Sequence, residues 1–115
     1  MEIGAEQASK LCSALEFQLF QESLHPEILT FSEERVRKRV QRATELCQLW
    51  SERVRLEQQR HNASASDSTR RRATTGYVTA ELKATLFAQV LARFETRLAQ
   101  QARKTRTIPK PLGPV

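Results

Sequence analysis

Residues 36–54 read VRKRVQRATELCQLWSERV, and this stretch decides the fold class. Its apolar side chains recur at spacings of four, three, four, three and four residues, which is the a/d spacing of a coiled-coil seam. The seam consists of Val36, Val40, Ala43, Cys47, Trp50 and Val54. Leu46 and Leu49 flank this seam, so the apolar stripe is wider than a minimal two-stranded contact. The pattern predicts a long amphipathic helix over about residues 31–60.

A second seam with the same spacing lies closer to the C-terminus. It begins at Ala80 and Ala84 and continues through Phe87, Leu91, Phe94 and Leu98. This pattern predicts a further amphipathic helix over about residues 76–103. Additional apolar residues beside the seam favour contact with two neighbouring elements rather than one. They are Leu82, Leu86 and Val90.

A shorter helix is predicted at the N-terminus, over about residues 5–24. Its apolar face is formed by Ala8, Leu11, Cys12, Leu15 and Leu19. His25-Pro26 ends it, because the residue before a proline avoids the helical region. The next helix starts at one of two competing caps. Thr30 can form a capping box with Glu33, and Ser32 is the other candidate.

Two segments lack the apolar residues that a packed element needs. Residues 61–75 read HNASASDSTRRRATT and are expected to form a flexible basic linker. Residues 104–115 contain three prolines and basic side chains, and are expected to form an extended, mobile tail.

These elements predict an all-α protein. We expect residues 1–60 to form a helical hairpin of the first two helices, with the third long helix attached through the linker. That third helix either folds back into a three-helix bundle or docks in coiled-coil fashion onto another subunit. The near absence of helix breakers inside the chain supports the helical assignment, because there are only 3 Gly and 4 Pro and most lie near the ends.

Composition argues against several classes of function. The chain has 2 His and 2 Cys, and none of them stands in a metal-ligand spacing or beside a catalytic partner. We therefore expect no catalysis, no metal and no cofactor. Cys12 and Cys47 are interpreted as reduced core residues. No signal sequence or stretch of roughly 20 apolar residues is present, so a cytoplasmic or nuclear protein is expected.

The charge balance is basic, with 19 Lys and Arg against 13 Asp and Glu. Arginines on one line of the second helix, together with those of the linker, are candidate contacts for an anionic partner. They are Arg35, Arg39, Arg42, Arg70, Arg71 and Arg72. Glutamates interrupt this face, which favours an ordinary solvated surface over a phosphate-binding one. Thr74 and Thr75 follow the arginine run and are candidate phosphorylation sites.

The preferred functional hypothesis is a non-catalytic scaffold or adaptor subunit that binds protein partners by helix packing. Both seams are the expected partner-binding residues, because they carry more apolar surface than a chain of 115 residues is expected to cover alone. A hetero-oligomer is favoured over a homo-oligomer. The alternative is a nucleic-acid or chromatin-binding protein that uses the arginine-rich face and linker.

Overall fold

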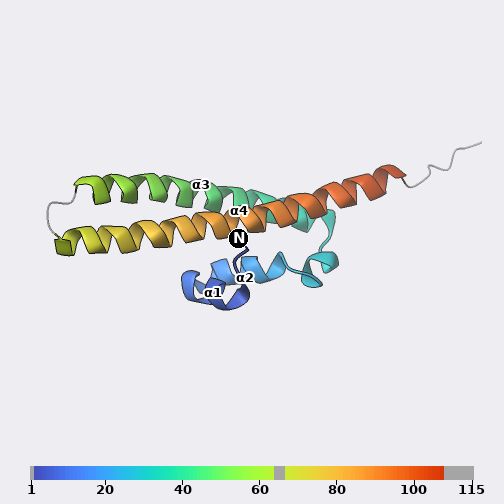
Figure 1. Ribbon diagram of the computed structural model, residues 1–115. Helices are drawn as coiled ribbons and strands as arrows, with labels where there is room; N and C mark the ends of the chain where they lie inside the picture. Colours follow the sequence, from blue (N-terminus) through green and yellow to red (C-terminus); the bar gives the residue numbers. More distant parts are fainter. Residues whose placement is uncertain (1, 64–66, 108–115) are drawn as a thin grey trace, which may run out of the picture.

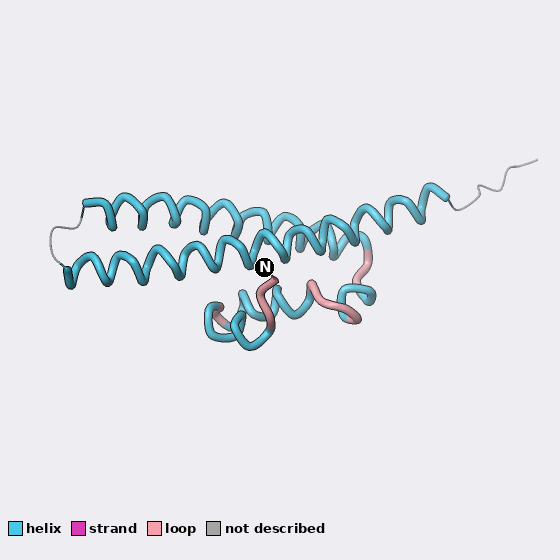
Figure 2. Tube along the Cα trace, in the orientation of Figure 1, coloured by secondary structure: helices cyan, strands magenta, loops and turns pink. Residues whose placement is uncertain are grey.

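A computed structural model describes residues 2–63 and 67–107; for residues 67–74 and 105–107 it describes the backbone alone. The elements are α1 (Ala5–Leu11), α2 (Ala14–Glu22), the 3-10 helix η1 (Glu27–Thr30), α3 (Glu33–Ala63) and α4 (Asp67–Thr107). The described residues contain no strand (Figure 2). The predicted all-helical class is confirmed.

The two longest helices form the body of the molecule. α3 and α4 lie side by side and run antiparallel, because the end of α3 and the start of α4 lie at the same end of the molecule (Figure 1). The result is elongated, with principal extents of 77 × 25 × 22 Å. The shorter elements α1, α2 and η1 pack against α4. The hairpin in the structure is formed by α3 and α4, whose matching seams bury each other, whereas the predicted hairpin paired the first two helices.

The start of α3 shows which of the two predicted caps is used. The Oγ of Ser32 accepts a hydrogen bond from the backbone N–H of Arg35 at 3.2 Å. The Thr30 hydroxyl instead donates to the carbonyl oxygen of Glu27 at 2.7 Å. Ser32 therefore caps α3, and the acidic Glu33 and Glu34 in its first turn complement the helix dipole.

The N-terminal helix predicted over residues 5–24 is two helices in the structure. The break lies at Cys12 and Ser13, whose backbones are extended. Ser13 starts α2 with a reciprocal capping box. The Ser13 N–H donates to Oε1 of Glu16 at 2.9 Å, and the Glu16 N–H donates to Oγ of Ser13 at 3.3 Å. These bonds satisfy two backbone donors at a new helix start and so stabilise the corner.

The predicted linker over residues 61–75 also differs from the structure. α3 continues to Ala63 and α4 begins at Asp67, so only residues 64–66 lie outside the description. Gln58, His61 and Asn62 line a groove with Tyr77 and Val78, so the ends of the two helices pack together. Packing against a neighbouring helix outweighs weak local propensity. The predicted tail likewise begins later, because 104–107 belong to α4, and residues 108–115 lie outside the described part.

The hydrophobic core lies where the short elements cover the hairpin. It joins residues from all five elements and from the N-terminal segment; the buried members are Ile3, Ala8, Leu19, Phe20, Ile28, Phe31, Val36, Ala43, Leu46, Leu86, Phe87, Val90 and Phe94. The N-terminal segment is held on α4 by a hydrogen bond from the backbone N–H of Ile3 to Oε1 of Gln89 at 3.0 Å. Between Leu46 and its end, α3 buries only Glu57 of the residues described.

Candidate interaction surface

The seam residues predicted to bind a partner lie mostly inside this chain. Val36, Ala43, Phe87 and Phe94 are fully buried in the core. Others pack against that core and are partly buried; they are Val40, Cys47, Trp50, Leu91 and Leu98. Val54 is partly buried and lines a shallow groove with Ala84 and Thr85. The two seams therefore face each other, and the fully buried members leave no surface for another chain.

The arginine line of α3 is partly neutralised by carboxylates. Arg39 binds Glu22 of α2 through Nε at 2.8 Å and through a second nitrogen at 3.2 Å, in a fork that fits a carboxylate. Arg42 lies 3.6 Å from Glu45. Arg35 stacks over the ring of Phe31, with its guanidinium carbon 4.0 Å from the ring centre. These contacts match a solvated face whose arginines also tie elements together.

The basic run before the second seam lies at the edge of what the structure describes. Arg70, Arg71, Arg72 and Thr74 belong to α4, and their side chains lie outside the described part of the chain. Thr75 is exposed. Thr74 and Thr75 lie inside α4, because the helix starts at Asp67 and not after the threonines as expected. A phosphate there would not lie at a helix N-terminus.

A buried polar cluster joins α2, α3 and α4. The Nζ of Lys83 lies 2.8 Å from Oε1 of Glu16 and 3.9 Å from the ring centre of Trp50. Burial opposes ionisation of Glu16, but the hydrogen bonds from Lys83 and Ser13 outweigh it, so the pKa of this carboxyl lies below its ordinary value. The indole N–H of Trp50 also favours the ionised carboxylate, although it does not meet hydrogen-bond geometry.

The two cysteines lie beside this cluster and on the seam. Burial, followed by the nearby carboxylate of Glu16, raises the pKa of the Cys12 thiol to about 11. Burial also raises the pKa of Cys47. Both are free thiols. A raised pKa suppresses the nucleophilic thiolate, so these cysteines fit a packing role better than a reactive one.

Exposed leucines form the most distinctive surface of α3. Leu49 is 55% exposed and Leu56 is 44% exposed, and they lie seven residues apart on one face. Leu15, which is 75% exposed at the start of α2, lines a groove with Leu46 that lies one turn from Leu49. We call Leu15, Leu49 and Leu56 the leucine flank. Three arginines of α3 border these leucines. Arg42 lies seven residues before Leu49, Arg53 lies four residues after Leu49, and Arg60 lies four residues after Leu56.

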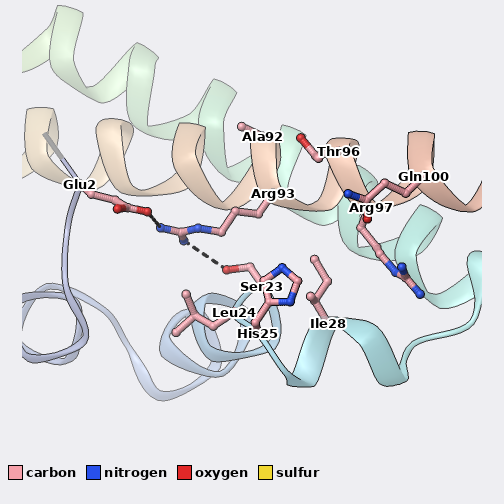
Figure 3. Close-up of a pocket in the computed structure, with 10 residues that line it drawn as sticks. All are labelled: Glu2, Ser23, Leu24, His25, Ile28, Ala92, Arg93, Thr96, Arg97 and Gln100. Carbon is pink, nitrogen blue, oxygen red and sulfur yellow. Dashed lines mark hydrogen bonds and ion pairs between the residues drawn. The ribbon is translucent and has the colours of Figure 1, made fainter.

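A hollow lies beside α4. It has a volume of about 370 Å³ and separates α4 from the segment that joins α2 to η1 (Figure 3). Its charged residues are Glu2, Arg93 and Arg97, and the ring of His25 lies between Ser23 and Ile28 in its lining. The sequence pattern did not indicate this hollow, because its lining residues lie up to about a hundred positions apart along the chain.

Neither a metal-binding cluster nor a membrane-spanning helix is found among the described residues. Over residues 2–63 and 67–107, no three His, Cys, Asp or Glu side chains lie close enough together to hold a metal ion. No helix in this part of the chain combines the length and apolar character of a membrane span. Comparison with protein-family models, curated proteins and solved structures finds no match to the chain.

Proposed function

We propose that this chain is a non-catalytic helical adaptor that binds a protein partner along the leucine flank. The observation that carries the proposal is the exposure of Leu49 and Leu56, one heptad apart, on a helix whose opposite face is already buried. Exposed leucines cost little singly, but a row at helical spacing is the anchor pattern of a helix-in-groove contact. This surface replaces the two seams as the proposed interface.

The surroundings of the leucine flank define the partner's chemistry. Arg53 lies beside Leu49 and Leu56 in the helical register, with its guanidinium carbon 5.9 Å from the Trp50 ring centre. Arg42 and Arg60 extend the basic edge, although each also pairs with a glutamate. A matching partner is an amphipathic helix with two apolar residues one heptad apart and acidic residues at its border. Acidic borders complement the basic edge and favour rapid association.

The test uses a pair of charge-matched variants of the full chain. Leu49→Glu/Leu56→Glu places two carboxylates on the leucine flank, whereas Gln41→Glu/Gln48→Glu places two at the same heptad spacing on a neighbouring exposed face of α3. Both should fold like the parent, because all four side chains are exposed. Tagged chains are purified from cells, and co-purifying proteins are quantified by mass spectrometry and reconstituted with purified components.

The expected result is one stoichiometric partner that is lost from the leucine variant and retained by the glutamine variant. Equal retention by both variants would remove the leucine flank as the interface. Sedimentation of the isolated chain tests whether the leucine flank mediates self-association instead. A dimer that the leucine variant dissociates would make the surface a self-association face and would overturn the adaptor proposal.

A further inference from the structure

Two arginines of α4, Arg93 and Arg97, line the hollow and differ in their contacts. The guanidinium of Arg93 donates to Oγ of Ser23 at 3.3 Å and to Oε1 of Glu2 at 3.1 Å. Ser23 is held in turn, because its hydroxyl donates to the carbonyl oxygen of Phe20 at 2.6 Å. Arg93 is therefore positioned and compensated within the chain, as the dashed contacts in Figure 3 show.

Arg97 follows one helical turn later and differs from Arg93 in its contacts. Its Nε is buried and has no hydrogen-bond partner among the described residues. In Figure 3 the Arg97 guanidinium lies beside Ile28, at the opposite end of the hollow from Glu2. Glu2 bonds to Arg93, so it does not compensate Arg97. A buried N–H without an acceptor is unfavourable, and a guanidinium next to an open hollow is ready to bind an oxyanion.

The shape and lining of the hollow select among anions. A guanidinium binds a carboxylate through two parallel N–H donors, and such paired contacts are stronger than neutral ones. The apolar lining of the hollow consists of Leu24, Ile28 and Ala92, and Ile28 lies beside the Arg97 guanidinium in Figure 3, where it offers apolar contact to carbon atoms next to the charge. The exposed side chains of Thr96 and Gln100 lie on its outer edge. A bare inorganic ion would leave this apolar lining unused.

We propose that this hollow binds the carboxylate side chain of an acidic peptide, with Arg97 as the anchoring residue and the apolar lining receiving the neighbouring aliphatic side chains. The site lies on α4 and on the segment between α2 and η1, so it does not involve the leucine flank. It adds a second recognition site, and its test does not depend on the outcome for the adaptor proposal.

The experiment reads Arg97 directly in the full chain. The Nε–Hε signals of the arginines are recorded by two-dimensional NMR and assigned with the Arg97→Gln variant. Three probes are each added alone: the peptide acetyl-Leu-Glu-Leu-amide, its glutamine counterpart acetyl-Leu-Gln-Leu-amide, and inorganic phosphate. The glutamate peptide is also added in the presence of phosphate. One charge pair at a half-buried guanidinium with flanking apolar contact supports binding of roughly millimolar affinity.

The expected result is a saturable shift of the Arg97 Nε–Hε signal with the glutamate peptide, and binding at least about 10-fold weaker with the glutamine peptide. Arg97→Gln should abolish the remaining backbone shifts around the hollow, and Arg97→Lys should weaken them, because it keeps the charge and loses the planar fork. Arg55→Gln removes the same charge from an exposed arginine on α3 and should leave binding unchanged. Thermal unfolding confirms that each variant folds.

Three outcomes would overturn the proposal. Equal shifts with both peptides would mean that the hollow recognises apolar groups and not the carboxylate. A phosphate shift that the glutamate peptide does not compete away would assign the hollow to free anions. An Arg97 signal that does not respond to any probe up to roughly ten times the expected dissociation constant would exclude an anion site there.

Discussion

Oε1 of Glu16 accepts two hydrogen bonds, one from the backbone N–H of Ser13 at 2.9 Å and one from Nζ of Lys83 at 2.8 Å. The same carboxylate therefore caps α2 and ties the corner between α1 and α2 to α4. The Glu16 and Lys83 side chains are only 12% and 9% exposed, so water screens this pair weakly. This contact therefore fixes the position of α1 and α2 on the hairpin of α3 and α4.

A double-mutant cycle should show that this pair is coupled. Lys83→Met leaves the Glu16 carboxylate uncompensated, and we expect it to lower the free energy of unfolding by about 2 kcal/mol. Glu16→Gln preserves the capping acceptor, and the double variant should recover part of the loss, with a coupling energy of about 1–2 kcal/mol. The free energies are measured by urea unfolding followed by circular dichroism.

The exposed pair of Glu34 and Lys38 is the matched control for this cycle. Its side chains are 81% and 67% exposed and its atoms lie 3.7 Å apart. The equivalent cycle, Glu34→Gln with Lys38→Met, should give a coupling below about 0.5 kcal/mol. Equal coupling in the two cycles would show that burial of the contact between Glu16 and Lys83 contributes nothing to its coupling energy.

The pKa of Glu16 predicts how stability changes with acidity. Because its pKa in the folded chain lies below the ordinary value of 4.5, the unfolded chain binds its proton first as the pH falls. The stabilisation is therefore complete above pH 4.5 and is lost as the pH falls through the folded pKa. Glu16→Gln lacks this titration. The stability difference between the parent and Glu16→Gln should be constant near neutrality and shrink as the pH falls below 4.5, and a difference that grows on acidification would contradict this assignment.

The long helices could be predicted because their signals are local. The seam spacing predicted α3 and α4, and most residues of both seams lie in or against the core. The capping box at Ser13 and Glu16 was equally local, since Ser followed three residues later by Glu is a helix-start signature. Apolar periodicity across residues 5–24 favoured one continuous helix and concealed that signature.

The remaining contacts could not be predicted from sequence, because they join distant positions. Glu16 and Lys83 lie 67 residues apart, and Ser23 and Arg93 lie 70 apart. Which helices pair is likewise a choice among competing apolar faces. The composition of residues 61–75 indicated a linker, yet most of this segment is helical once its ends lie beside each other in the hairpin. The hollow near Arg97 forms where α4 meets Glu2 and the segment that joins α2 to η1, so no local pattern indicated it.

Gly76 gives a test of packing between α4 and α3, where it faces Glu57. A Cβ added there would lie 2.7 Å from Oε2 of Glu57, which is the end of a flexible side chain that can rotate away. Alanine is the better helix former, so Gly76→Ala should raise the free energy of unfolding by up to about 1 kcal/mol.

Gly4 supplies the contrast for this prediction. It is the N-cap of α1, with an extended backbone and no atom within 4 Å of an added Cβ. Alanine is a poorer N-cap than glycine, so Gly4→Ala should be neutral or destabilising by a few tenths of a kcal/mol. Thermal unfolding of both variants checks the signs. Destabilisation by Gly76→Ala would mean that the Glu57 side chain is held rigidly against α4.

The raised pKa of Cys12 predicts a slow thiol that responds to its neighbour. At pH 8, a rise in pKa from 9.0 to about 11 lowers the thiolate fraction by about 100-fold. In a Cys47→Ser background, alkylation of Cys12 by iodoacetamide should be slower in the folded chain by about that factor than in guanidinium chloride. Glu16→Gln removes the nearby negative charge and should speed the folded reaction modestly, because burial is the larger cause of the shift. Equal rates in the folded and unfolded chain would show that the corner at Cys12 opens freely, and that the contact between Glu16 and Lys83 does not hold α1 and α2 on the hairpin.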